Sequence, residues 1–288
     1  MSSLAPTLAR DFNARPPGYC SAARALTINR LQQPATQASN DASAVPDFAA
    51  SCPAFTMAFQ PIVDVDKGEV YAHEALVRGI HGEGAGHILG LVHARHRVEF
   101  DRACRAKAIE LAAGLRMASR LSLNVMPNDT GRQGECFQSA VETAERFGFP
   151  KERLIFEVTE SERVEDLPHL VKAFEMHQQH GFSSAIDDFG AGFAGFELFV
   201  ALKPHIVKLD MELIRNIHTD GVRRAVVKGF VSTCGELGIH VVAEGVEVME
   251  EAMALRELGI RLFQGYLFAR PVVETLPAVN WEWEKRFD

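Results

Sequence analysis

Short apolar runs rich in β-branched residues alternate with longer segments of helical spacing along most of the chain. The runs, which are typical of strands, are Phe59 to Val65, Val70 to Val77, Leu121 to Val125, Leu154 to Val158, Ser184 to Ile186, Ile206 to Leu209, His240 to Ala243 and Ile260 to Phe263. The helical segments include Phe100 to Leu115, Asp166 to His180, Asp220 to Leu237 and Glu247 to Leu258. Strand and helix in turn predict βαβ units and a mainly parallel sheet.

The first two runs are joined too closely for a parallel connection. Their link, Asp64 to Glu69, is a short turn sequence with Asp-Lys-Gly at its centre. A parallel crossover needs about a dozen residues, so this pair must be antiparallel. If the fold begins near Phe55, 234 of the 288 residues remain, which suits the roughly 250 residues of a (β/α)8 barrel. The sequence therefore predicts an α/β protein, a (β/α)8 TIM-like barrel with an antiparallel first strand.

The first 54 residues have a different composition. Leu31 to Pro53 is rich in Gln, Ala, Ser, Asn and Pro, contains no Lys or Arg, and shows no sustained apolar period. Such a segment buries too little surface to offset the entropy of ordering it, which is typical of a linker. Ala23 to Leu31, before it, could form a short helix. We expect an N-terminal extension, partly a disordered linker, over 1–54 and one domain over 55–288.

Composition argues against several classes of function. Lys and Arg number 30 against 38 Asp and Glu, a net charge of −8, which disfavours a protein that holds DNA or RNA by nonspecific phosphate neutralisation. The five cysteines are scattered and form no CxxC pair, so neither a disulfide framework nor a zinc site is supported. No apolar stretch approaches the ~18 residues of a membrane span, and the amino terminus lacks the features of a secretory signal. We expect a cytoplasmic protein without a membrane anchor.

A polar side chain follows most of the predicted strands at the carboxyl end. The set comprises Glu74, Asn124, Glu157, Asp187, Asp188, Lys208, Glu244 and Gln264. In a barrel the carboxyl ends of the strands converge on one face. Each residue taken alone is typical of an ordinary strand end that faces water. Taken together, five carboxylates in one cavity would repel one another unless positive charge compensates them.

The chemistry of these side chains indicates a divalent metal. Lys208 supplies one positive charge, and cations are the natural source of the rest. A set of carboxylates with one Asn amide, and with no Cys or His, suits Mg²⁺ or Mn²⁺ better than zinc or copper. The acids are numerous enough for two ions about 3.5 to 4 Å apart, which would activate a water for phosphoryl displacement. Lys208 could orient or deprotonate that water, or stabilise charge on the phosphate.

A series of short motifs follows in a fixed order. They are QPIV at 60–63, EALVR at 74–78, Asn124, EVTE at 157–160, DDFGAG at 187–192, KLD at 208–210, AEGVE at 243–247 and QGYLF at 264–268. From about Phe55 to Pro271, this ordered set resembles EAL domains, the bacterial cyclic-di-GMP phosphodiesterases named for that Glu-Ala-Leu. The 54 residues before it are too few for a sensor, receiver or GGDEF module, so we expect a stand-alone EAL protein.

The resemblance implies a barrel with an antiparallel first strand and hydrolysis of one phosphodiester bond of cyclic di-GMP to linear pGpG, which lowers second-messenger signalling. It implies metal ligands at Glu74, Asn124, Glu157, Asp187, Asp188 and Glu244. Lys208, Glu244 and Glu74 would carry catalysis, with Lys208 at the attacking water. Substrate contacts would come from Gln60, Leu76, Arg78, Glu247 and Gln264. Glu160 would brace the loop after Asp188.

Two segments depart from the common family pattern. AGFAG at 191–195 stands where many members carry TGYSS, and this form resembles the EAL branch associated with blue-light-sensing BLUF domains. The loop links substrate binding to dimerisation in the family, so the resemblance implies a homodimer through this loop and the helix from Ala194 to Leu202. Gly79 to Gly90 is Gly-rich and short, which predicts a flexible rim loop.

Two functions remain open at this point. The first is a metal-dependent phosphodiesterase. The second is a catalytically idle EAL domain that acts as a cyclic-di-GMP receptor or docks onto a regulatory protein, since the BLUF-associated branch includes members that bind protein partners. Degenerate members usually lose a metal ligand or the lysine, and none is lost here, which favours the enzyme.

Overall fold

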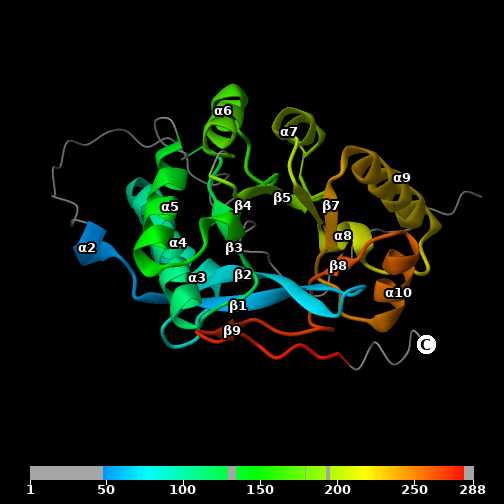
Figure 1. The fold of residues 1–288 in the computed structure, drawn as a ribbon, viewed down its shortest axis with the longest axis horizontal. Helices are drawn as coiled ribbons and strands as arrows, with labels where there is room; N and C mark the ends of the chain where they lie inside the picture. Colours follow the sequence, from blue (N-terminus) through cyan, green and yellow to red (C-terminus); the bar gives the residue numbers. More distant parts are fainter. Residues whose placement is uncertain (1–47, 129–133, 179, 193–194, 282–288) are drawn as a thin grey trace, which may run out of the picture.

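A closed barrel of strands, wrapped by helices, forms the body of the computed structural model, which describes residues 48–128, 134–178, 180–192 and 195–281 (Figure 1). The strands are β1 (Phe55–Asp64), β2 (Glu69–Gly79), β3 (Arg120–Val125), β4 (Leu154–Thr159), β5 (Ser183–Phe189), β6 (Ile206–Leu209), β7 (His240–Ala243), β8 (Leu262–Phe263) and β9 (Val272–Val273). The helices are α2 (Phe48–Ser51), α3 (Ala85–Leu91), α4 (Arg97–Gly114), α5 (Glu135–Phe147), α6 (Leu167–Gln178), α7 (Gly195–Leu202), α8 (Met211–Ile214), α9 (Gly221–Leu237) and α10 (Met249–Glu257).

Strand pairing closes the sheet in the order β2-β3-β4-β5-β6-β7-β8-β1, with β1 also paired to β2. β1 and β2 form the expected antiparallel hairpin, from Phe55↔Gly79 to Asp64↔Glu69. The successive pairs from β2–β3 to β7–β8 are all parallel, and β8 meets β1 antiparallel. The predicted (β/α)8 barrel with an antiparallel first strand is therefore confirmed. β9, which was not expected, adds to β1 outside the closed barrel.

The inside of the barrel consists of an apolar layer beneath a polar one. The apolar layer is a separate cluster of buried residues: Ile62, Ala72, Ile155, Ala185, Ile206, Val242 and Leu262. Two positions along each of these strands, on the same face, lie Gln60, Glu74, Glu157, Asp187, Lys208, Glu244 and Gln264. Because side chains of a strand alternate between its two faces, one polar side chain in or just past each of these seven strands lies one layer above the apolar floor. The floor seals the barrel below, and the polar layer faces the open mouth.

The main core lies between the outer face of the barrel and the helices. Phe156 of β4 packs edge-on against Phe137 of α5, with ring centroids 4.9 Å apart, and Phe137 in turn lies 4.6 Å from Phe174 of α6. Phe189 of β5 stacks on Phe230 of α9 at 4.4 Å. Such pairs add about 0.5–1.5 kcal/mol each beyond the burial of their area. They fix the positions of strands β4 and β5, which carry three of the predicted metal ligands.

Several elements differ from the sequence-based expectations. Helix α3 begins at Ala85, inside the Gly-rich segment Gly79 to Gly90, and continues to Leu91. The prediction of a flexible loop is therefore wrong for residues 85–90. The reason is Ile88, which is buried against Val92 and Phe100 in a small apolar cluster. α5, which was also missed, completes the crossover from β3 to β4.

The predicted linker ends in a helix rather than in irregular chain. α2 occupies part of it, and Phe48 packs beside the ring of His96, with centroids 5.7 Å apart. The helix expected at Ala23 to Leu31, and the rest of the linker up to residue 47, lie outside the described residues.

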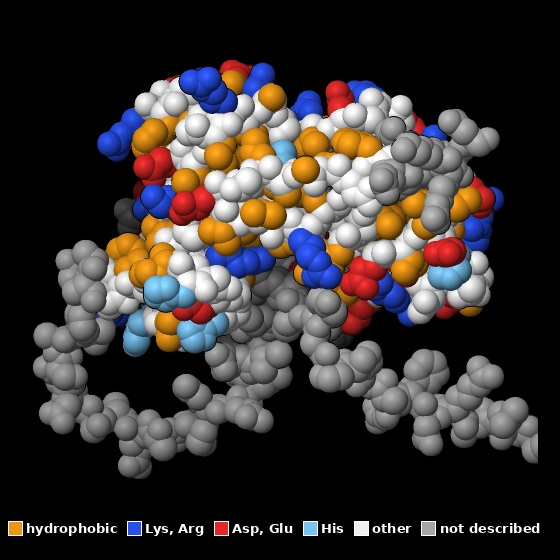
Figure 2. Space-filling view, turned by 90° about the horizontal axis from the view of Figure 1, so that it is seen from below, with side chains coloured by type: hydrophobic (Ala, Val, Ile, Leu, Met, Phe, Trp, Pro, Cys, Tyr) orange, Lys and Arg blue, Asp and Glu red, His pale blue; other side chains and the backbone are white. Residues whose placement is uncertain are grey.

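The face seen from below carries mixed side chains (Figure 2). Hydrophobic, acidic and basic groups are interspersed over it; several histidine side chains lie together at the lower left, and others lie apart from them. Among the described helices, none is long and apolar enough to cross a membrane.

Candidate functional site

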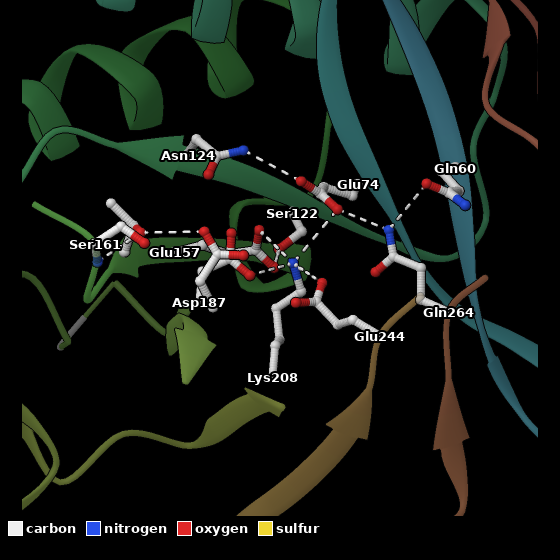
Figure 3. Close-up of polar contacts among 12 residues, drawn as sticks. Gln60, Glu74, Ser122, Asn124, Glu157, Ser161, Asp187, Lys208, Glu244 and Gln264 are labelled. Atoms are coloured by element: carbon white, nitrogen blue, oxygen red, sulfur yellow. Dashed lines mark hydrogen bonds and ion pairs between the residues drawn. The ribbon is translucent and has the colours of Figure 1, made fainter. Parts of the chain in front are cut away.

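The ammonium group of Lys208 lies among four carboxylates inside the barrel (Figure 3). Its Nζ is 2.7 Å from Glu244 Oε1 and 2.8 Å from Asp187 Oδ1. It is 3.2 Å from Glu157 Oε2 and 3.4 Å from Glu74 Oε2. Lys208 is fully buried. One ammonium group therefore pairs with four carboxylates, which come from strands β2, β4 and β5 and from the end of β7.

Amide and hydroxyl groups hold the outer oxygens of these carboxylates. Gln264 Nε2 donates to Glu74 Oε2 at 2.7 Å and to Gln60 Oε1 at 3.4 Å. Asn124 Nδ2 donates to the other oxygen of Glu74 at 3.3 Å. Ser122 Oγ donates to Glu157 Oε1 at 2.5 Å. Sequence reasoning missed Ser122, although it lies two residues before Asn124 on β3 and so shares the inward face.

The strand β5 contains an irregularity that brings two consecutive acids to one cleft. Its pairing with β6 shifts register between Ile186 and Phe189, and Asp188 has a left-handed φ of 55°. In a regular strand, Asp187 and Asp188 would point to opposite faces. The irregularity instead lets both line the cleft. The two acids lie inside β5 rather than after it, because the strand continues to Phe189.

Glu160 holds the loop that follows β5. Its Oε1 accepts hydrogen bonds from the main-chain nitrogens of Gly190, at 2.8 Å, and Gly192, at 2.5 Å. A side chain at Gly192 would meet the main-chain oxygen of Glu160 at 2.7 Å, so only glycine fits there. The buried carboxylate at Glu160 thus fixes the backbone beside Asp188, whose own carboxylate accepts from Thr159 Oγ1 at 3.4 Å.

Two groups of acids have the spacing of a metal site. Glu74, Glu157 and Asp187 form one group, and Asp187, Asp188 and Glu244 form the other; within each group one oxygen per residue lies within 4.8 Å of the others. Asp187 belongs to both. All of these ligands are oxygens, which is the donor set of Mg²⁺ and Mn²⁺. The residues present therefore fit a pair of hard divalent cations that share one carboxylate.

The pKa values of Lys208 and its carboxylates reflect an excess of negative charge. Burial raises the pKa of Glu157 to about 8, against the effect of Lys208, and the neighbouring Glu74 and Asp187 raise it further. Burial and Asp187 raise the pKa of Glu244 well above its usual range. Burial alone would lower the pKa of Lys208, yet the surrounding carboxylates, Asp187 first, raise it. Without metal, protons would supply the charge that Lys208 alone does not balance.

Metal-free protein should therefore lose stability as the pH rises. The folded pKa of Glu157 is about 8 and its ordinary value 4.5, so the folded state holds an extra proton in this window. The free energy of unfolding must then fall, through this group, from pH 4.5 to pH 8. Divalent ions compensate the same charge, so Mn²⁺ should raise the unfolding temperature more near pH 8 than near pH 5. Calorimetry with EDTA or Mn²⁺ at both pH values tests this. In Glu157→Gln the rise in unfolding temperature caused by Mn²⁺ should differ less between the two pH values.

The polar layer forms the floor of a cleft of about 400 Å³. The expected substrate contacts Gln60, Leu76, Arg78, Glu247 and Gln264 all line it. The carboxylate of Glu247 also pairs with Arg215, 3.3 Å away. Sequence reasoning missed Tyr266 on the cleft wall, whose ring lies under Arg270 with the guanidinium 4.1 Å from the centroid. Its place inside the motif at 264–268 could have indicated it.

A buried arginine holds the end of β3 from the helix layer. Arg105 of α4 donates through Nη1 to the main-chain oxygen of Asn124 at 3.3 Å, and the same nitrogen forms an ion pair with Asp101. Burial alone would lower the pKa of Arg105. Asp101 contributes most to raising it. Arg105 thus supports the backbone of a predicted metal ligand, and nothing in the strand pattern pointed to it.

Replacing Arg105 with methionine should destabilise the fold by about 3–5 kcal/mol, because it leaves a partly buried carboxylate without its partner. Urea unfolding in EDTA measures this. The double variant Asp101→Asn with Arg105→Met should recover part of the loss. Equal stability of wild type and Arg105→Met would show that the ion pair contributes nothing.

The ordered motifs and their geometry correspond to a known family. Residues 49–271 match the family model of the EAL domain, which is more than half of the chain. The chain belongs to the EAL domain family. The EAL domain is similar to the blue light- and temperature-regulated antirepressor BluF of Escherichia coli, at 31% identity over 79% of this chain and 57% of that protein. It is also similar to the cyclic di-GMP phosphodiesterase RocR of Pseudomonas aeruginosa, at 30% identity over 76% of this chain and 58% of RocR.

The chain thus spans little more than half the length of these two relatives. Two solved structures have a higher sequence identity. A standalone versatile EAL protein from Vibrio cholerae, in its c-di-GMP bound form, is 45% identical with a TM-score of 0.76 over 80% of this chain and 97% of that chain. Klebsiella pneumoniae BlrP1 in a manganese and cyclic-diGMP complex is 35% identical with a TM-score of 0.73, over 76% of this chain and 56% of that chain.

Proposed function

We propose that this EAL domain hydrolyses one phosphodiester bond of cyclic di-GMP to give linear pGpG and requires divalent metal ions. The observation that carries the proposal is the ring of oxygen ligands around Lys208, which is complete and lies at the floor of an open cleft. Similar EAL structures hold c-di-GMP, one of them together with manganese, which supports this choice of substrate and metal.

Two Mg²⁺ or Mn²⁺ ions would be held by Glu74, Asn124, Glu157, Asp187, Asp188 and Glu244. When bound, the two metal ions would neutralise charge on the phosphate and lower the pKa of a bound water. In the structure Asn124 turns its Nδ2 toward Glu74, which leaves its amide oxygen for a cation. The shared position of Asp187 in both acidic groups supports two ions rather than one.

Lys208 acts as a cation in this proposal. In the metal-free structure the carboxylates around it, Asp187 first, raise its pKa against the effect of burial. A protonated amine orients the attacking water and offsets the charge that develops on the phosphate; it does not take the proton of the water. Orientation of the water and stabilisation of charge on the phosphate are therefore the roles that we propose for Lys208. Gln264 donates to both Glu74 and Gln60 and so holds these two side chains in position.

The dinucleotide would lie along the cleft wall. Arg78 donates through Nη1 to the Val77 main-chain oxygen at 2.8 Å, and its other donors are suited to a phosphate. Leu76 supplies an apolar surface for a base, and Gln60, Glu247 and Gln264 supply polar contacts.

The direct test is turnover of cyclic di-GMP by the purified full chain. With Mg²⁺ or Mn²⁺, chromatography should show pGpG, and an excess of EDTA should abolish it. The similarity to an antirepressor favours one alternative, an EAL domain that binds the dinucleotide or a regulatory protein without turnover. Binding of cyclic di-GMP by calorimetry without formation of pGpG would establish that alternative.

We also propose a homodimer through α7 and α9. Phe196 and Val200 of α7 are 70% and 67% exposed, and Val222 and Val226 of α9 are 74% and 55% exposed. The two helices meet where Phe196 packs against Phe230, with centroids 6.2 Å apart. Large apolar side chains gathered on one surface are typical of an interaction site. The predicted contacts at residues 193 and 194 lie outside the described residues.

Phe196→Asp should therefore give a monomer, measured by light scattering. Met253→Asp, at an exposed position on α10, is the matched control and should leave the mass unchanged. A wild-type monomer would contradict the proposed dimer.

We place the protein in the cytoplasm, which the free state of Cys52, Cys104, Cys136 and Cys234 supports.

A further inference from the structure

A second cavity, of about 120 Å³, lies behind the barrel wall beside the cleft. It opens because two neighbouring strands diverge: the pairing of β2 with β3 ends at Glu74↔Ser122, although β2 continues to Gly79 and β3 to Val125. Helix α4 closes the gap from outside. Its wall includes Leu76, Val92, Arg97, Phe100, Cys104, Arg105 and Asn124.

The lining defines the chemistry of an occupant. Val92, Phe100 and Cys104 belong to one apolar cluster and make most of the wall hydrophobic. The charges of Asp101 and Arg105 neutralise each other. Arg97 is different, because its Nε is buried and has no hydrogen-bond partner. An unpaired buried donor is costly, and a ligand that presents an acceptor would relieve that cost.

The cavity shares two residues with the cleft. Leu76 and Asn124 line both, one as an expected substrate contact and the other as an expected metal ligand. Arg105, in the cavity wall, donates to the main-chain oxygen of Asn124. A molecule in the cavity would therefore pack directly behind Asn124 and against the arginine that supports it.

We propose that this cavity binds a small, uncharged, mainly apolar molecule with one hydrogen-bond acceptor, and that its occupation strengthens divalent metal binding through Asn124. An apolar cavity of comparable size accepts a benzene-sized molecule, which sets the scale of the ligand. The effect on metal binding rests on the proposed function. The binding of a ligand in the cavity does not.

Acetophenone is a suitable probe, and α-methylstyrene, of the same shape without the carbonyl oxygen, is its matched control. Ligand-observed NMR on the full chain should give a Kd of about 1 mM for acetophenone, as expected for nine non-hydrogen atoms at modest efficiency. The control should bind about fivefold more weakly, the contribution of one hydrogen bond. Arg97→Met should remove that difference.

Cys104→Leu fills part of the cavity and should abolish binding of both probes, with circular dichroism confirming the fold. Leu89→Phe, at a half-buried position of the wall, is a second filling variant if the first unfolds. Unchanged binding in a folded filling variant, or no binding to wild type, would overturn the proposed site.

Coupling is tested by calorimetric titration of Mn²⁺ without substrate. Saturating acetophenone should lower the Kd for Mn²⁺ about fivefold in wild type, at the weak end of allosteric coupling, and have no effect in Cys104→Leu. Acetophenone binding with an unchanged Kd for Mn²⁺ would overturn the link through Asn124. Neither measurement involves pGpG, so absence of turnover would count against the proposed function and not against this site.

Discussion

Replacing Glu74 with alanine is expected to reduce the turnover of cyclic di-GMP by about 100- to 1,000-fold or more, the scale seen when one preorganised charge-stabilising group is lost. The reason is its position. One oxygen of Glu74 accepts from Asn124, and the other accepts from Gln264 and lies 3.4 Å from Lys208. Removal of this carboxylate takes away a proposed metal ligand and the acceptor that Asn124 and Gln264 share, while Lys208 keeps three carboxylates around it.

The measurement is pGpG formation at saturating Mn²⁺, together with the Kd for Mn²⁺ by calorimetry. Loss of a ligand should weaken metal binding as well as turnover, whereas loss of a substrate contact alone would raise KM and spare the metal affinity. Glu69→Ala is the matched control, because Glu69 lies on the same strand with an exposed carboxylate next to Lys67. It should keep the wild-type rate. A wild-type rate in Glu74→Ala would remove Glu74 from the metal site.

The barrel and its mouth could be predicted because both depend on local order in the sequence. The layering follows from the two-residue period of each strand, so that Ile155 and Glu157, or Ile206 and Lys208, share one face. A one-residue shift would have turned every acid away from the cleft. The alternation of apolar and polar residues near the strand ends therefore contains most of the information about the site.

The rest depends on contacts between distant parts of the chain. The irregularity in β5 that turns Asp187 and Asp188 to one cleft arises from pairing with β6, which no local pattern in β5 reveals. Helix α3 forms because Ile88 packs on Phe100 of a later helix, and this outweighs its glycines. Arg105 resembles any helical arginine until α4 is placed against β3. In each case tertiary packing overrides what the neighbouring residues favour.

Lys208→Met should give the second large effect, and it separates stability from catalysis. Lys208 is the fully buried cation within 3.4 Å of four acidic side chains. Without it, metal-free protein near pH 8 should be about 3–5 kcal/mol less stable than wild type, the cost of leaving buried charge uncompensated. Protonation of the acids supplies the missing charge at low pH, so the loss of stability should shrink toward pH 5. Mn²⁺ should restore much of it near pH 8.

Urea unfolding of both proteins, in EDTA and in Mn²⁺ at the two pH values, measures this. With the metal bound, the variant should still bind cyclic di-GMP, yet its kcat should fall at least about 100-fold, because the group that orients the water is missing. Lys67→Met, an exposed position on the β1–β2 turn, should change neither quantity. If Lys208→Met loses cyclic di-GMP and metal binding together with its rate, then Lys208 is a structural ion-pair partner. If kcat alone falls, its ammonium group acts on the reacting water.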